Sequence, residues 1–189
     1  MCIRDRTAAA RDDGITALGL LAAMAVSGAE LNLWQVTHRV EQSPMPAAER
    51  EQTVALQKQI QTAVLTGKGW ETVPVPLRLR ADTEWFRSFL SFTPDVHLSR
   101  AKQPVLVLHG LLDTQVPPSN ADRFEELSGK IKGRKQPIEV VRVPGVNHLL
   151  VPAKTGEVDE YSSLRDAQVS PGVIEPLAAW LKRTFAAVR

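Results

Sequence analysis

Apolar positions in the first half of the chain recur with the period of a helix. Over Ala47–Thr66 they return about every 3.6 positions and Gly67 follows, which predicts an amphipathic helix that ends at the glycine. The stretch 29–42 also has helical spacing, and the stretch 67–79, which holds two prolines, is predicted to be a loop. Asp82 is a candidate N-cap for a short helix. That helix would place four apolar residues on one face: Trp85, Phe86, Phe89 and Leu90.

Beyond residue 100 the pattern changes to short apolar strands that alternate with helices. Pro104–His109 and Ile138–Val143 are typical strands, and Pro117–Leu127 between them is predicted to be helical. A final helix would begin with Ser170 as N-cap and carry Ile174, Leu177, Leu181 and Phe185 on its apolar face. The apolar stretch Ile15–Met24 would add a further buried strand. This alternation predicts an α/β fold with a parallel sheet.

Composition narrows the class of protein. The chain has 189 residues, of which 43% are hydrophobic and 23% charged, and this suits one globular domain with at most a small subdomain. A net charge of +2 provides no basic surface for nucleic acid. The single cysteine, Cys2, excludes a disulfide within the chain and a cysteine-rich zinc site. No apolar run reaches the ~18 residues of a membrane span.

The first 29 residues have two interpretations. A secretory signal would use the arginines before residue 12, the apolar stretch Ile15–Val26 and a cleavage site after Ala29, but aspartates stand among those arginines. Alternatively, the chain begins within a domain, and Thr7–Arg11 is the end of a helix. Met1–Arg6 resembles a translated sequencing adapter, in which case the true N-terminal part is missing.

Two polar residues follow neighbouring strands of the predicted sheet. Asp113 comes after Pro104–His109, and His148 comes after Ile138–Val143. The carboxyl ends of parallel strands meet at one edge of the sheet, where ligands bind. Asp113 could therefore accept a hydrogen bond from Nδ1 of His148, fix its tautomer and leave Nε2 to take a proton from a nucleophile. Either residue alone could be structural, but the two together, in this order, predict a catalytic pair.

The sequence around this pair resembles the C-terminal half of an α/β-hydrolase, in the serine-aminopeptidase and dienelactone-hydrolase-like branch. Pro104–Pro118 is similar to the family's acid-bearing strand and turn, and Pro144–Leu150 to its histidine loop. The resemblance implies that Asp113 is the acid and His148 the general base, with no cofactor. The histidines are scattered at no ligand spacing, so no metal site is expected. It also implies a core strand within 7–28, a helical cap over 29–100 and a C-terminal core over 101–189.

The nucleophile motif of that family, Gly-x-Ser-x-Gly, does not occur in this sequence. In family order it would precede Ile15–Met24, so the chain is expected to be a fragment of a serine hydrolase that is inactive as it stands. Ser27 has small neighbours, but only one strand and no oxyanion loop would precede it, and a serine that begins the cap is the simpler interpretation. Leu108-His109-Gly110 is similar to the family's oxyanion strand, but no nucleophile motif follows it. His109 is therefore expected to be a core histidine.

Two other functions stay open. A non-catalytic binding or interaction module could use the same half-sheet, whose open edge near residues 15–24 would be prone to pairing. A secreted protein cleaved after Ala29 is the second. For a hydrolase, the partner is a small-molecule ester or a peptide substrate, with neither nucleic acid nor a membrane span, and with the oligomeric state open.

Overall fold

The computed structural model describes residues 8–12, 14–131, 138–164 and 167–186. Cys2, Met1–Arg6 and Thr7, which bear on the interpretation of the N-terminus, lie outside the described residues. The chain forms two compact units. One consists of residues 26–93, and the other consists of the residues on both sides of that stretch.

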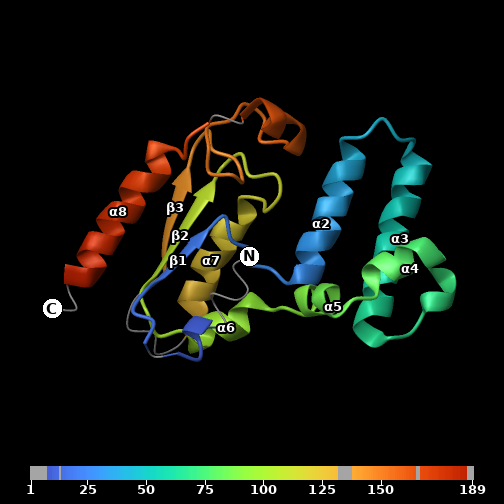
Figure 1. The fold of residues 1–189 in the computed structure, drawn as a ribbon, viewed down its shortest axis with the longest axis horizontal. Coiled ribbons are helices and arrows are strands. Elements are labelled where there is room, and N and C mark those ends of the chain that lie inside the picture. Colours follow the sequence, from blue (N-terminus) through green and yellow to red (C-terminus); the bar gives the residue numbers. More distant parts are fainter. Residues whose placement is uncertain (1–7, 13, 132–137, 165–166, 187–189) are drawn as a thin grey trace. The chain divides into compact units, whose positions relative to one another are not determined.

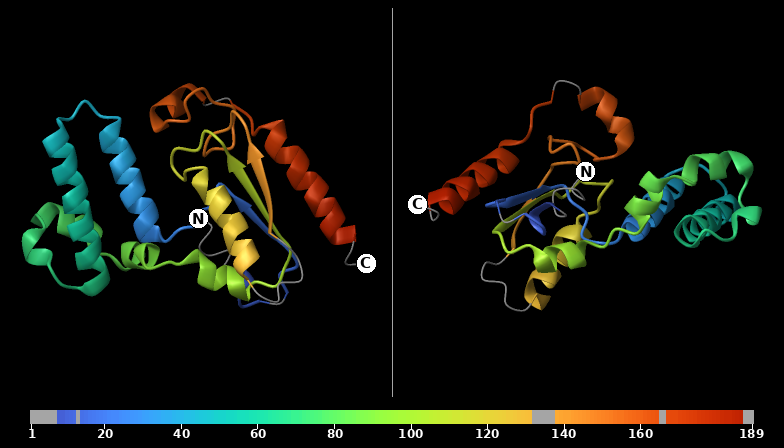
Figure 2. Two further views of the ribbon diagram at one scale, coloured as in Figure 1. Left: turned by 180° about the vertical axis from the view of Figure 1, so that it is seen from behind. Right: turned by 60° about the horizontal axis from the view of Figure 1, so that its bottom comes forward.

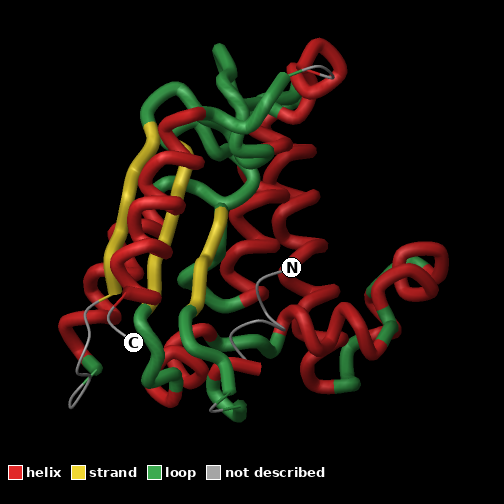
Figure 3. Tube along the Cα trace, turned by 60° about the vertical axis from the view of Figure 1, so that its left-hand side comes forward, coloured by secondary structure: helices red, strands yellow, loops and turns green. Residues whose placement is uncertain are grey.

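The flanking residues build a parallel sheet, as the sequence predicts. Its three strands are β1 (Leu18–Leu21), β2 (Val105–Gly110) and β3 (Ile138–Val143), in the order β1-β2-β3. Leu18 pairs with Val105 and Val105 with Ile138, so β2 is the central strand, and all three strands point the same way (Figure 1). Figure 3 shows the three strands side by side. The chain is thus of the α/β class, and its strand ends share one edge of the sheet.

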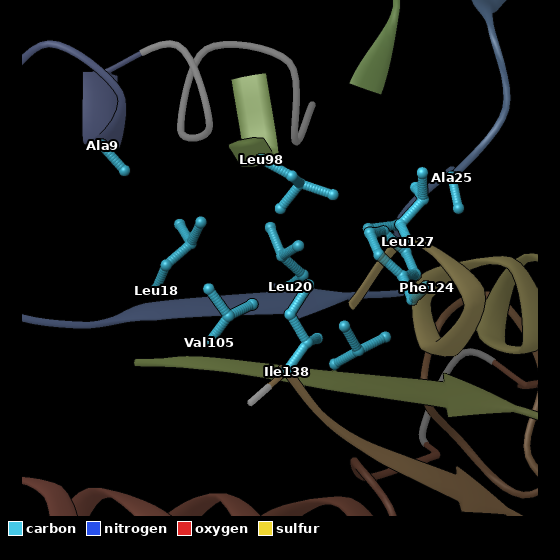
Figure 4. Close-up of a cluster of buried hydrophobic side chains, with 11 residues drawn as sticks. Ala9, Leu18, Leu20, Ala25, Leu98, Val105, Phe124, Leu127 and Ile138 are labelled. Carbon is cyan, nitrogen blue, oxygen red and sulfur yellow. The ribbon is translucent and has the colours of Figure 1, made fainter. Parts of the chain in front are cut away.

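Helices cover both faces of this sheet, which explains why β2 is apolar at nearly every position. Val105 and Val107 face a core that includes Phe124 and Leu127 of α7 (Ser119–Lys130), together with Leu98 of α6 (Pro94–Arg100) (Figure 4). Leu106 and Leu108 face the opposite core, with Val173 and Trp180 of α8 (Pro171–Ala186). Figure 2 shows α7 and α8 on opposite sides of the strands. Every side chain of β2 is buried, as a central parallel strand requires.

The buried stripe of α8 differs from the predicted one. Val173 and Trp180 are buried and Leu177 is partly buried, at positions i, i+7 and i+4. Three of the four residues expected on the apolar face are exposed instead: Ile174, Leu181 and Phe185. The helix has apolar residues on two adjacent stripes, and Trp180, as the larger side chain, occupies the core. Ser170 is buried, and its backbone carbonyl accepts from the N–H groups of Val173 and Ile174.

Residues 26–93 form a helical unit with a core of its own. Its elements are α2 (Gly28–Glu41), α3 (Ala47–Thr66), the 3₁₀ helix η1 (Trp70–Thr72), α4 (Val75–Ala81) and α5 (Glu84–Leu90). Helix α3 has the bounds that its spacing predicts, and Gly67 ends it with φ of +73°. Seven buried side chains make this core: Ile60, Ala63, Val64, Trp70, Val73, Ala81 and Leu90. The prediction that this stretch acts as a cap remains a prediction.

Local predictions for the second part of this unit are wrong in three places. The expected loop over 67–79 contains η1 and most of α4, because Pro76 lies in the first turn of α4, where no backbone N–H is needed. Asp82 ends α4, and Thr83 is the N-cap of α5, with its hydroxyl accepting from the Phe86 N–H. Trp85 is 73% exposed and stacks on Phe89 rather than entering the core.

Candidate active site

Asp113 lies in a tight turn that follows β2. Its side chain is 1% exposed, and its Oδ1 accepts hydrogen bonds from the backbone N–H groups of Gln115 (2.9 Å) and Val116 (2.8 Å). A buried carboxylate needs such donors, since desolvation otherwise disfavours the charged form. These two bonds hold Oδ1 and leave Oδ2 to face another partner.

His148 lies in a loop after β3 that Asn147 shapes from inside. The Asn147 side chain is fully buried, and its Oδ1 accepts from the N–H groups of Leu149 (3.0 Å) and Val151 (3.4 Å). Its own backbone N–H donates to the carbonyl of Val151 at 3.1 Å, and Leu150 adopts a positive φ of +63°. Asn147 therefore closes a compact loop around the histidine, a role that the sequence analysis did not assign.

The two loops bring Asp113 and His148 together. Nδ1 of His148 lies 2.9 Å from Oδ2 of Asp113, and the His148 side chain is 29% exposed while that of Asp113 is buried. Because the carboxylate can only accept, Nδ1 carries the hydrogen of this bond and Nε2 of the neutral ring keeps its lone pair. The exposure lets a molecule from solvent reach the imidazole. Such a ring can accept a proton at Nε2 while the carboxylate stabilises the resulting cation.

A third segment, within residues 154–164, packs on the Asp113 turn. Gly156 has φ of +79°, and a β-carbon there would overlap the carbonyl of Leu112. The Thr114 hydroxyl donates to the Gly156 carbonyl at 2.8 Å, and the Gln115 amide donates to the Tyr161 hydroxyl at 2.8 Å. Burial raises the pKa of Tyr161 above its ordinary value of 10.0, so its hydroxyl remains a donor and acceptor near neutral pH. The segment thus fixes both residues that follow Asp113.

Glu160 holds this segment in its folded form. It lies in the 3₁₀ helix η2 (Val158–Leu164). Its carboxylate accepts from the N–H groups of Lys154 (2.7 Å), Thr155 (3.0 Å) and Gly156 (2.9 Å), and from the Thr155 hydroxyl (2.8 Å). These donors, the backbone ones first, lower the pKa of Glu160 from 4.5 to about 2. The only signal in the sequence was Gly156 with acidic residues after it, a pattern equally typical of a plain surface loop.

Ser27 performs a structural role in its own unit. It is the N-cap of α2: its hydroxyl accepts from the Glu30 N–H at 3.2 Å and donates to the Glu30 carboxylate at 2.8 Å. The Glu30 carboxylate in turn accepts from the Ser27 N–H at 3.0 Å, which completes a capping box. A serine in this position begins a helix, as the simpler interpretation of the sequence has it.

Other classes of site find little support in the described part of the chain. Among residues 8–12, 14–131, 138–164 and 167–186, no group of three or more His, Cys, Asp or Glu residues could hold a metal ion. Within the same residues, no helix has both the length and the apolar character needed to cross a membrane.

Comparisons with known proteins add a distant structural similarity. No protein-family model matches the chain, and no curated protein matches it. A crystal structure of a mutant of esterase E22 is similar with a TM-score of 0.40 at 12% sequence identity, over 87% of this chain. The chain spans 57% of the length of that esterase. A similarity this low does not show the function of this chain.

Proposed function

We propose that this chain carries the acid and the general base of a serine hydrolase that cleaves ester or amide bonds through an acyl-enzyme. The observation that supports it is the 2.9 Å contact between Nδ1 of His148 and Oδ2 of Asp113, made by loops that follow neighbouring parallel strands. The α/β-hydrolase family, which these loops resemble in sequence, uses an acid and a histidine in this order along the chain. The nucleophilic serine would belong to sequence that precedes β1.

The proposed reaction has two steps. The serine hydroxyl attacks the carbonyl carbon of the substrate, and its proton passes to Nε2 of His148. The tetrahedral intermediate collapses, the bond to the leaving alcohol or amine breaks, and His148 gives the proton to that leaving group. Water then attacks the acyl-enzyme and gives a proton to His148. As the bond between the acyl group and the serine oxygen breaks, His148 returns that proton to the serine, and the acid is released. Asp113 stays ionised throughout and stabilises the imidazolium.

Two exposed apolar residues indicate what the substrate would carry. Leu111 and Leu149 are 40% and 45% exposed, and they lie in the same two loops as Asp113 and His148. Apolar side chains beside a few polar groups are typical of small-molecule sites. We therefore propose an apolar acyl or side-chain group in the substrate. Replacing both leucines with serine in an active chain should raise KM for a long acyl ester more than for a short one.

The first test concerns the gene upstream of codon 7. A sequencing read through that region should show a continuous reading frame with a Gly-x-Ser-x-Gly motif before β1. The longer protein should then react covalently with a fluorophosphonate probe at that serine. A continuous frame without such a motif, or a longer protein that the probe does not label, contradicts the proposal.

The second test assigns the roles of the two residues. In the longer protein, Asp113→Asn and His148→Gln should each slow probe labelling by at least about a hundredfold. The first removes the charge that orients and stabilises His148, and the second removes the general base. Asp122→Asn, at an exposed aspartate of α7, removes the same charge as Asp113→Asn and should leave the rate unchanged. Equal rates in all variants would contradict the roles given to Asp113 and His148. The 189-residue chain alone should not be labelled, and labelling at Ser27 would identify it as the nucleophile instead.

A further inference from the structure

A second histidine meets Asp113 from inside the protein. His109 is the penultimate residue of β2 and is fully buried. Its Nε2 lies 2.8 Å from the carbonyl oxygen of Val116, at the far end of the Asp113 turn, and 3.7 Å from Oδ2 of Asp113. Only the first of these distances is a hydrogen bond. The sequence analysis expected a core histidine at this position, and the structure adds that its ring is tied to the turn.

The contact with Val116 defines the protonation of the ring. A carbonyl can only accept, so the hydrogen of His109 is on Nε2 and the bare nitrogen is Nδ1. Nδ1 is buried and has no hydrogen-bond partner among the described residues. Burial, the largest influence, lowers the pKa of His109 below 6.5. The charges of His148 and Arg142 act in the same direction, while the Val116 bond and the Asp113 charge oppose it. His109 is therefore neutral near pH 7.

A continuous series of hydrogen bonds then runs from the central strand to the partly exposed imidazole of His148. His109 donates to the Val116 carbonyl, and the Val116 N–H donates to Oδ1 of Asp113 at 2.8 Å. Oδ2 of the same carboxylate accepts from Nδ1 of His148 at 2.9 Å. Each bond orients the next group, and the first group is a side chain of a fully buried strand. Because His109 is neutral, it orients the turn without competing with His148 as the cation beside Asp113.

We propose that His109 is a positioning residue that holds the Asp113–Val116 turn so that the Asp113 carboxylate stays aimed at Nδ1 of His148. This proposal rests on the proposed function for its catalytic meaning. A histidine that merely fills space is the competing explanation. An apolar side chain would fill the same space without leaving a buried nitrogen unpaired, and such unpaired groups destabilise the folded state. The N–H that reaches Val116 is what an apolar residue cannot supply.

The test compares three substitutions in the 189-residue chain, each labelled with ¹⁵N in its histidine rings. His109→Gln places an amide N–H near the position of Nε2, so it should keep the bond to Val116. His109→Asn is polar but too short to reach, and His109→Leu fills the space without a donor. In the unmodified chain, His109 should carry its hydrogen on Nε2 and His148 on Nδ1. The backbone amide spectrum of each variant reports whether it remains folded.

We expect the exchange rate of the His148 Nδ1 hydrogen to depend on whether residue 109 has an N–H donor, and not on the volume of its side chain. In His109→Leu and His109→Asn, solvent exchange of the His148 Nδ1 hydrogen should accelerate about tenfold or more, because the turn opens locally. His109→Gln should exchange at nearly the native rate. A folded His109→Leu or His109→Asn variant with native exchange at His148 would overturn the proposal. If neither of these variants folds, a hydrogen found on Nδ1 of His109 in the unmodified chain overturns it, and one found on Nε2 supports it.

These signals require neither turnover nor a nucleophile. Exchange of the His148 Nδ1 hydrogen that depends on the N–H donor at position 109, combined with a failed search for the upstream serine, would support the positioning role and contradict the hydrolase function. In an active longer protein, His109→Leu should lower kcat with little change in KM, because His109 lies behind Asp113 and does not touch the substrate.

Discussion

The α-carbon of Gly110 lies directly against the carbonyl of Val146, with no room for a β-carbon between them. The same carbonyl accepts a hydrogen bond from the Leu112 N–H at 2.9 Å. These contacts join the end of β2 to the loop that follows β3, three residues beyond the end of that strand. Asp113 and His148 lie a few residues further along the two loops. The close approach at Gly110 is therefore what allows their side chains to meet.

We expect Gly110→Ala to lower the free energy of unfolding by about 2–3 kcal/mol, because the methyl group must displace the backbone at Val146 and Asn147 in a packed interior. The hydrogen bond between Asp113 and His148 should be lost with it. Urea denaturation measures the first effect, and the exchange of the His148 ring hydrogen measures the second.

Gly129→Ala is the matched control. Gly129 lies within α7, and no atom lies within 4 Å of the place where its β-carbon would be. The alanine should stabilise the protein by about 0.5–1 kcal/mol, because a helical glycine costs conformational entropy. Equal effects of the two substitutions would show that the contact between the loops has no special importance.

Asp113 should stabilise the fold as well as serve the site. Asp113→Ala leaves the N–H groups of Gln115 and Val116, the second of them buried, without their acceptor, and hydrogen bonds to a charged group are worth about 1.5–3 kcal/mol each. We expect a loss of roughly 3 kcal/mol by urea denaturation. Asp113→Asn keeps an acceptor oxygen in that place, so it should cost about 1 kcal/mol.

The comparison separates folding from chemistry at this residue. In an active chain, both variants should be strongly impaired, although Asp113→Asn is nearly as stable as the native protein. Native activity of the Asp113→Asn variant would contradict the proposed role of the carboxylate charge, whatever the stability of that variant.

The contact between Asp113 and His148 could be predicted from sequence, because it follows from the order of the strands. Two apolar strands predict neighbours in a parallel sheet, and polar residues just past their ends then lie at the same edge. The contributions of His109 and Asn147 could not be predicted in this way. Each depends on which backbone group a buried side chain reaches within its loop, and neither spacing nor composition carries that information. Gly156 packs closely on the backbone of Leu112, and a glycine in a loop sequence gives no indication of such a contact.

Helix faces were harder to predict where apolar residues are plentiful. In α3 a single apolar stripe gives the right bounds, whereas α8 has two adjacent stripes and only packing against β2 and β3 chooses between them. In α4, a proline in the first turn looks like a loop signal although its geometry is compatible with a helix. Tertiary contacts decide both cases, which is why residue patterns alone gave the wrong face and the wrong loop.

Because α8 buries the apolar stripe that contains Trp180, we expect substitutions of Trp180 and Phe185 to differ in their effect on stability. Trp180 is 2% exposed and packs against the sheet, so Trp180→Ala should destabilise the protein by about 3–5 kcal/mol. Phe185 is 49% exposed, and Phe185→Ala should change stability by no more than about 0.5 kcal/mol. Chemical denaturation of both variants checks this contrast. A larger cost for Phe185 would favour the apolar face that the sequence pattern predicts.

Glu160 should make the segment beside the site sensitive to acid. Its pKa is about 2 in the folded protein, against an ordinary value of 4.5, because backbone N–H groups donate to the charged form. A lowered pKa means that the stabilising effect is fully present above pH 4.5 and is lost as the pH falls towards 2. Glu160→Gln removes the charge that these donors bind. The variant should be less stable than the native protein near pH 7, and this difference should shrink as the pH falls through that range.

Urea denaturation of the two proteins at several pH values tests this directly, and amide exchange at Lys154 and Thr155 shows whether the loss is local. Glu175→Gln removes the same charge from an exposed position of α8 and controls for net charge. A stability difference for Glu160→Gln that stays constant from neutral pH down to pH 2 would show that the bonds to the ionised carboxylate do not hold the segment. Because Thr114 and Gln115 bond to this segment, its opening in acid should also increase exchange at the Val116 amide, next to the carboxylate of Asp113.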